Sequence, residues 1–185
     1  MADNIMQETR IMDNFLQLER SVRRHLNSIG QFFPLLMLRL LLAWEFWEAG
    51  LQKFNGTNWF QHIQADFPFP FSVIDPHISW FMATWFELLG GVALLIGLGT
   101  RYVSISLLVL TIVATMAVHI PSEGWASFSD MLGGYAISDK GFGNYKIPLI
   151  YMITFMPLIF MGAGKASVDH GIFLYLKKRL HKKVA

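Results

Sequence analysis

Apolar positions along the chain gather into runs that are long enough to cross a lipid bilayer. A hydrocarbon layer about 30 Å thick needs about 20 residues of helix to span it. Backbone N–H and C=O groups find no partners in lipid, so such runs must form helices. The pattern predicts an all-α polytopic membrane protein, with a bundle of four transmembrane helices at about residues 32–52, 77–98, 102–120 and 147–163.

The first 31 residues follow a different pattern, in which apolar residues recur at steps of three and four and the opposite face is charged. Such spacing predicts an amphipathic helix. We expect residues 1–31 to lie as a cytoplasmic helix in the membrane interface, and a short coiled coil with a partner protein or a second copy is the alternative. The apolar positions are Ile11, Phe15, Leu18, Val22, Leu26 and Ile29.

Composition supports membrane insertion and excludes several chemistries. Charged residues make up only 15% of the chain and the mean hydropathy is +0.41, whereas about a quarter of a soluble domain is charged. The chain has no cysteine, which excludes disulfides, thiolate metal sites, iron–sulfur ligation and cysteine nucleophiles. It also lacks a phosphate-binding loop, a dinucleotide fingerprint and a nucleophile elbow.

Basic residues are unevenly divided between the predicted connections. The N-terminal arm, the turn between the second and third runs and the tail hold most of the 15 lysines and arginines. Cytoplasmic segments carry the excess of Lys and Arg, so both termini should be cytoplasmic, in a bacterial-type inner membrane. The opposite side holds Lys53, Lys140 and Lys146. The basic tail, 169–185, follows the membrane portion, 32–168, and should attract anionic headgroups rather than nucleic acid.

Several ionisable side chains lie inside the predicted spans, where a charge normally faces the bundle interior and has a partner. At about 100° per residue, Arg39 falls off the helix face that carries Glu45 and Glu48. Its expected partner is therefore Glu87 of the second run, which lies at a suitable depth, and Asp169 is the second choice.

Glu45 and Glu48 are three residues apart and can share one helix face, where Lys53 could relieve their repulsion by snorkelling. The intramembrane charges either only fix helix packing or line a polar cavity that handles protons or a polar headgroup, such as that of a quinone. The second interpretation predicts a proton-handling cluster of Arg39, Glu45, Glu48 and Glu87, with His119 and Trp44 as quinone contacts.

Histidines on the predicted outward side could in principle serve a metal or a haem. His62, His77 and His119 map there, but none of them forms a pair with metal-ligand spacing on one helix. We therefore expect no metal site, and a quinone is favoured over haem or copper as a bound group.

The order of several short motifs resembles that of the DoxX family (DoxX/DoxD-like integral membrane proteins). Arg39 lies early in the first run, "EAGLQKF" ends it, and "ELLGGVALLIGLGTR" ends the second. His119 ends the third run and "GAGKASVD" closes the fourth. Together these motifs cover about residues 35–170. The resemblance implies a four-helix membrane bundle, and members of the family include a subunit of a thiosulfate:quinone oxidoreductase.

Two functional hypotheses follow. The first is a quinone-linked redox component of a membrane oxidoreductase complex. This hypothesis leaves open whether the chain itself is catalytic. The second is a non-catalytic membrane scaffold, or a transport or export accessory for a small molecule or peptide. The lipid bilayer is one partner in both, and a homodimer is possible. In the second hypothesis the docking surfaces for a protein partner are the N-terminal arm, residues 1–31, and the two outward connections, about residues 53–76 and 121–146.

Overall fold

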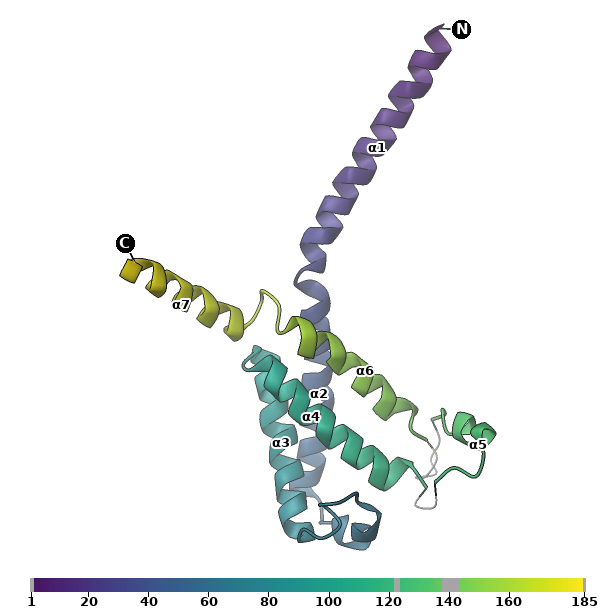
Figure 1. Cartoon of the computed structure of the whole chain (residues 1–185), viewed down its shortest axis with the longest axis vertical. Coiled ribbons are helices and arrows are strands. Elements are labelled where there is room, and N and C mark those ends of the chain that lie inside the picture. Colours follow the sequence, from purple (N-terminus) through teal and green to yellow (C-terminus); the bar gives the residue numbers. More distant parts are fainter. Residues whose placement is uncertain (1, 122–123, 138–143, 185) are drawn as a thin grey trace. The chain divides into compact units, whose positions relative to one another are not determined.

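The computed structural model describes residues 2–121, 124–137 and 144–184, and side chains between 12 and 182 within these ranges. All regular structure there is helical, which confirms the predicted all-α class (Figure 1). The chain divides into two compact units, residues 1–34 and 35–185. Helix α1, Ala2–Gly30, belongs to the first unit.

The second unit contains the apolar helices. The longer elements are α2 (Phe33–Asn55), α3 (Pro76–Ile96), α4 (Thr100–Ala114), α6 (Lys146–Met161) and α7 (Val168–Val184). The short ones are η1 (Phe60–His62), η2 (Gln64–Asp66), the π turn η3 (Thr115–His119) and α5 (Phe128–Gly133).

Within the described ranges, three helical stretches are long and apolar enough to cross a membrane: Met12–Asn55, Pro76–Ile96 and Thr100–His119. They correspond to the first three predicted spans. The fourth predicted span is the apolar helix α6, which at 16 residues is shorter than the usual spanning length. The count of four spans stays a prediction.

Local sequence signals set the ends of α3. Asp75 precedes the helix, and its carboxylate accepts a 2.7 Å hydrogen bond from the backbone N–H of His77. Pro76 occupies the first turn, where its missing N–H costs nothing. Gly97 ends the helix in the left-handed conformation, with φ of 71°, and Leu98 N–H bonds back to Ala93 C=O at 2.9 Å.

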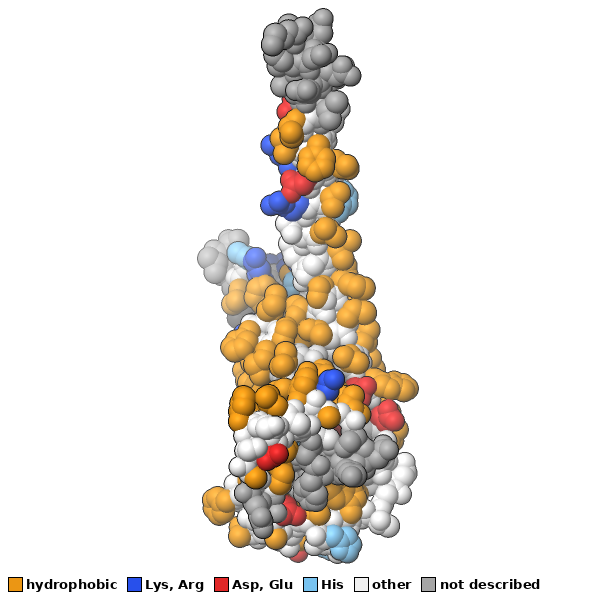
Figure 2. All heavy atoms as spheres, turned by 90° about the vertical axis from the view of Figure 1, so that its right-hand side faces the viewer, with side chains coloured by type: hydrophobic (Ala, Val, Ile, Leu, Met, Phe, Trp, Pro, Cys, Tyr) orange, Lys and Arg blue, Asp and Glu red, His pale blue; other side chains and the backbone are white. Residues whose placement is uncertain are grey.

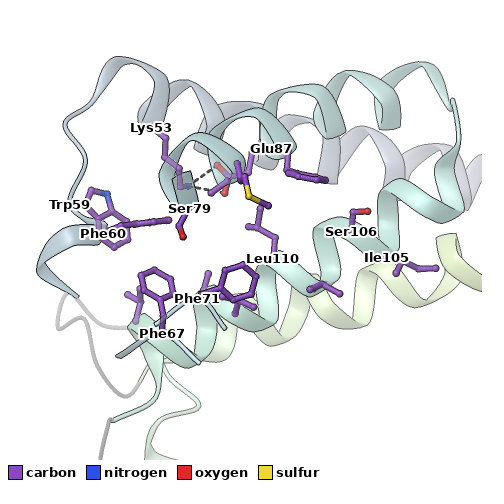
Figure 3. A pocket seen from close by; sticks show the side chains of 17 residues that line it. Lys53, Trp59, Phe60, Phe67, Phe71, Ser79, Glu87, Ile105, Ser106 and Leu110 are labelled. Atoms are coloured by element: carbon purple, nitrogen blue, oxygen red, sulfur yellow. Dashed lines mark hydrogen bonds and ion pairs between the residues drawn. The ribbon is translucent and has the colours of Figure 1, made fainter. Parts of the chain in front are cut away.

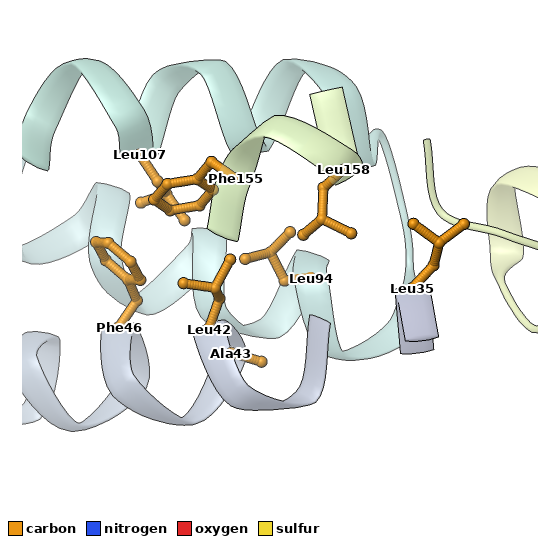
Figure 4. Packing of buried hydrophobic residues seen from close by; sticks show 8 residues of the cluster. All are labelled: Leu35, Leu42, Ala43, Phe46, Leu94, Leu107, Phe155 and Leu158. Atoms are coloured by element: carbon orange, nitrogen blue, oxygen red, sulfur yellow. The ribbon is translucent and has the colours of Figure 1, made fainter. Parts of the chain in front are cut away.

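Helices α2, α3, α4 and α6 share one apolar core (Figure 4). The ring of Phe46 packs against that of Phe155, with centroids 5.4 Å apart. Interlocking aromatic and branched side chains of this kind fix the helices relative to one another. The buried members are Leu35, Leu42, Ala43, Phe46, Leu94, Leu107, Phe155 and Leu158.

Two successive glycines let α3 approach two neighbours closely. A Cβ on Gly91 would lie 3.0 Å from the carbonyl oxygen of Ala43 in α2. A Cβ on Gly90 would lie 3.0 Å from the side chain of Leu107 in α4. Small residues at such positions are typical of membrane helix pairs, because they allow backbones to approach.

The guanidinium of Arg39 ties three segments together. Its Nε donates to Leu94 C=O at 2.9 Å, and Nη2 donates to Leu95 C=O at 3.0 Å. Nη1 donates to the carbonyls of Ala163 and Ala166, both at 2.8 Å. The residue is only 1% exposed. The predicted Arg39–Glu87 pair is therefore wrong: the guanidinium binds the carbonyl end of α3, where the helix dipole favours a cation.

Asp169, in the first turn of α7, binds the same turn between α3 and α4. Its oxygens accept from Gly99 N–H at 2.7 Å and Thr100 N–H at 3.0 Å, which caps α4. Its own N–H donates to Gly97 C=O at 3.0 Å. Asp169 attracts Arg39 electrostatically, but its oxygens bond to the N-terminus of α4. We call this the turn-side end of the unit, and the end with the α2–α3 connection the loop-side end.

Large hydrophobic side chains cover much of the surface of the spanning helices. Leu89 is 62% exposed and Ile153 61% exposed. Figure 2 shows hydrophobic side chains over much of one face of these helices. A lipid-facing belt has this distribution.

Helix α1 is described by itself. Phe15, Leu18 and Leu26 are exposed, and Arg23 pairs with Glu19 one turn away. The interfacial position of this helix and the cytoplasmic side of both termini stay predictions. The side chain of Ile11, and Lys140, which entered the orientation argument, lie outside the described residues.

The turn-side end provides a stability test with an internal control. Gly97→Ala should lower the free energy of unfolding by several kcal/mol, because its Cβ would lie 2.6 Å from Ser167 Cβ and 2.7 Å from Arg39 Cζ. A Cβ on Gly99 would meet no atom within 4 Å. Gly99→Ala should therefore lower the free energy of unfolding only by the roughly 1–2 kcal/mol that a left-handed backbone costs an alanine. Unfolding in detergent measures both, and equal losses would contradict the packing of Arg39 under this turn.

Candidate functional site

A buried ion pair joins α2 to α3. Lys53 Nζ lies 2.8 Å from Glu87 Oε1 and 2.7 Å from Oε2. Their side chains are only 17% and 4% exposed. Lys53 therefore reaches from the last turn of α2 to Glu87. The expectation that it would instead relieve the repulsion between Glu45 and Glu48 is wrong. Glu87 thus has a cation partner, but from the loop-side end.

A pocket of about 370 Å³ adjoins this pair (Figure 3). We call it the loop-roofed pocket, because residues of the α2–α3 connection line one side of it, next to α3 and α4. Aromatic rings make up one side, and Lys53 and Glu87 supply its charged groups. The lining residues of the connection are Trp59, Phe60, Phe67 and Phe71, and those of the helices include Ser79, Met82, Phe86, Ser106, Leu110 and Val113.

Ring contacts and side-chain hydrogen bonds hold the roof in place. The ring of Phe60 lies 5.1 Å from that of Trp80 in α3 and 4.9 Å from that of Phe67, in edge-on and tilted arrangements. Asn58 Oδ1 accepts from Phe60 N–H at 3.0 Å, and its Nδ2 donates to Pro76 C=O at 3.3 Å. The connection is thus fixed to the start of α3.

Ser79 offers a free donor in the pocket wall. Its hydroxyl oxygen is buried and has no hydrogen-bond partner among the described residues, and Figure 3 shows it turned toward the pocket. A buried hydroxyl without a partner costs about 1–3 kcal/mol. A bound group with an accepting oxygen would remove that cost.

A second pocket, of about 230 Å³, lies between α2, α4, η3 and α6. We call it the tyrosine pocket, because Tyr151 O–H donates to Glu45 Oε2 across it at 2.5 Å. Glu87 and His119 also line it. The structure therefore brings together two members of the predicted cluster, Glu45 and Glu87, with the predicted quinone contact His119, and Glu87 lines both pockets.

A π turn shapes the tyrosine pocket. α4 gives way to the π turn Thr115–His119, a distortion that is frequent at functional sites. Thr115 Oγ1 donates to Thr111 C=O at 2.6 Å. His119 Nδ1 lies 2.6 Å from Asn144 Oδ1, so Nδ1 is the donor in that bond. The hydrophobic pattern gives no sign of this turn or of Tyr151 as a partner of Glu45.

The remaining predicted residues lie elsewhere. Arg39 is at the turn-side end. Glu48 is exposed on α2, where its Oε1 accepts from Gln52 at 3.4 Å. Trp44 is 67% exposed. Glu48 and Trp44 line neither pocket; their predicted roles as proton carrier and quinone contact remain predictions.

The described ranges contain no group of three or more His, Asp or Glu that could hold a metal ion. His77 Nδ1 instead lies 3.5 Å from Asn58 Nδ2. The chemistry available in the two pockets is therefore hydrogen bonding, charge pairing and proton transfer by carboxylate, hydroxyl and imidazole groups.

The ion pair can be tested by a double-mutant cycle. Lys53→Met should lower the free energy of unfolding by about 3–5 kcal/mol, because it leaves a buried carboxylate without a counter-charge. Adding Glu87→Gln should recover part of that loss. Lys146→Met, which removes a cation over the Tyr135 ring, is the control and should cost about 1 kcal/mol or less. Strictly additive effects of Lys53→Met and Glu87→Gln would rule out the pair.

Comparison with known proteins agrees with this architecture. The DoxX family model matches residues 34–120. An uncharacterized protein of Haemophilus influenzae is 44% identical over 144 residues, 78% of this chain and 86% of the relative. A second uncharacterized protein of the same organism is 26% identical over 155 residues, 80% and 98% of the two chains. No solved structure matches. The chain belongs to the DoxX family.

Proposed function

We propose that this protein binds a quinone headgroup in the loop-roofed pocket and acts as a quinone-linked redox component of a membrane oxidoreductase complex. The observation that carries the proposal is an aromatic pocket of about 370 Å³ with a buried Lys–Glu pair in its wall. Pockets for small molecules are usually apolar, of about 300–1,000 Å³, with a few polar groups that orient the ligand.

The polar groups of the pocket suit a flat ring with accepting oxygens. A quinone is apolar except for its carbonyl oxygens, which can only accept hydrogen bonds. Lys53 and Ser79 both offer donors in the pocket wall. Phe60, Phe67 and Phe71 supply ring faces and edges for stacking. A bound quinone would supply the two-electron chemistry, and the electrons would come from a redox partner protein.

Proton movement is the task that fits Glu87. Quinone reduction consumes protons, and carboxylates within spans are typical proton relays. Glu87 lines the loop-roofed pocket and the tyrosine pocket, so it can exchange a proton with either. In the tyrosine pocket, Glu45, Tyr151 and His119 are hydrogen-bonding groups that can hold or pass a proton. We propose that protons reach Glu87 by this side.

Topology follows from the same proposal. α6 packs along α4 and would serve as the fourth span, tilted or with local bilayer thinning to offset its length. The turn-side end carries Arg101, Lys165 and the basic helix α7, so it would face the cytoplasm. The loop-roofed pocket would then lie in the outer half of the membrane, and both termini would be cytoplasmic.

The quinone proposal predicts a hydroxyl-specific effect on binding. Ser79→Ala should weaken the affinity for a short-chain quinone roughly threefold to tenfold, as expected for one lost hydrogen bond. Ser104→Ala is the matched control, because Ser104 has an equally buried, unpartnered hydroxyl but lines neither pocket. Quenching of tryptophan fluorescence during quinone titration measures both. No saturable quenching, or equal losses in both variants, would refute the assignment.

The second candidate, a scaffold or export accessory, is favoured by the exposed apolar stripe of α1. Met12, Phe15, Leu18 and Val22 are 49–63% exposed, as expected of a surface that binds a partner protein or a second copy. Deleting residues 1–30 should then abolish co-purification of the partner while leaving quinone titration unchanged. An unchanged set of co-purified proteins would remove this candidate.

A further inference from the structure

Helix α7 is not covered by the other described residues of its unit. All residues from 171 to 182 are exposed, and Figure 1 shows the helix running away from the other helices of its unit. Its large apolar side chains are 44–65% exposed, which is far more than a helix in water normally leaves open. They are Ile172, Phe173, Leu174, Tyr175, Leu176 and Leu180.

The apolar and charged positions of α7 are partly segregated. Ile172, Leu176 and Leu180 recur at steps of four, so they fall on one face at about 100° per residue. Lys177 and Lys178 lie at the sides and back of that face, whereas Arg179 lies at its edge, about 20° from Ile172. A basic helix of this kind, with aromatic residues on its apolar side, is typical of the membrane interface.

Charge distinguishes α7 from α1. The charged residues of α7 beyond its first turn are all cationic: Lys177, Lys178, Arg179, Lys182 and Lys183. The acidic residue of its first turn, Asp169, is committed to the N-terminus of α4. α1, by contrast, carries both signs and pairs Glu19 with Arg23. A uniformly cationic helix complements an anionic surface.

The start of α7 is fixed at the turn-side end. Asp169 N–H bonds to Gly97 C=O at 3.0 Å, and Ser167 Oγ accepts from His170 N–H at 3.2 Å. Gly97 directly follows α3, and α6 ends at Met161, a few residues before α7. The helix therefore begins where the spanning helices end, which is the level of the lipid headgroups.

We propose that α7 is an interfacial helix that binds anionic phospholipid headgroups through its cationic residues while Ile172, Phe173, Leu176 and Leu180 enter the acyl boundary. Its lysines can cover the edges of the apolar face by snorkelling. Since each cation near an anionic surface contributes about fivefold to binding, insertion should depend strongly on lipid charge.

The absence of cysteine allows single-label experiments on the full chain. Phe173→Cys on the apolar face and His181→Cys on the polar face each carry an environment-sensitive fluorophore, in vesicles of phosphatidylcholine with or without about a quarter phosphatidylglycerol. The label at position 173 should shift to the blue and be quenched by brominated acyl chains only with phosphatidylglycerol. The label at 181 should change little.

A charge variant with a matched control completes the test. Replacing Lys177, Lys178, Arg179, Lys182 and Lys183 by Gln should abolish the shift, as should high salt. Replacing Arg20, Arg23 and Arg24 of α1 by Gln should leave it intact, and retained helical content and elution volume verify folding. The proposal is overturned if the shift is equal without phosphatidylglycerol. It is also overturned if the shift depends on protein-to-lipid ratio, which would indicate a second copy.

Discussion

The buried guanidinium of Arg39 is the interaction on which the arrangement of the helices depends. A charge removed from water is stable only when its hydrogen-bonding groups are matched. Here Nε, Nη1 and Nη2 donate to carbonyls of α3 and of the 163–166 segment. The negative end of the α3 dipole lies at the same place. One side chain of α2 thereby sets the position of α3 and of the chain that leaves α6.

The position of Arg39 determines the position of the site. α2 and α3 run antiparallel, so fixing Arg39 at Leu94 sets which residues face each other further along. Gly91 then lies against Ala43, and Glu87 lies beside Lys53. The two cations of α2 thus lie at opposite ends: Arg39 binds carbonyls at the turn-side end, and Lys53 supplies a charged group to the loop-roofed pocket. Asp169 repeats the principle with the opposite sign at α4.

Sequence pattern predicts the parts of this structure that depend on composition and periodicity. Long apolar runs predict the helices, and the order of Arg39 and the glycine-rich segments indicates the family. Glu45 and Glu87 of the predicted cluster and the predicted quinone contact His119 line the tyrosine pocket, and their roles there stay predictions. The predicted pairing of Arg39 with Glu87 is wrong. Membrane depth indicates which charged side chains could meet, but it does not reveal that backbone carbonyls at a helix end can bind the guanidinium instead.

Other features depend on contacts between distant segments and give no local signal. The roof depends on the Phe60–Trp80 contact, and the free hydroxyl of Ser79 is evident only once that roof is placed. The sequence places Lys53 near Glu45 and Glu48 of its own helix, but the packing of α3 against α2 brings Glu87 within its reach. The bond from Tyr151 to Glu45 joins helices α2 and α6, and no periodicity within either helix predicts it.

Photoaffinity labelling with an azido-quinone in native-like membranes tests most directly whether the loop-roofed pocket binds a quinone. Mass spectrometry of the digested protein should find the label on residues 59–86 and 105–118, and excess unmodified quinone should compete it away. Labelling spread along lipid-facing side chains such as Trp44 and Leu89, with no competition by excess quinone, would contradict the account.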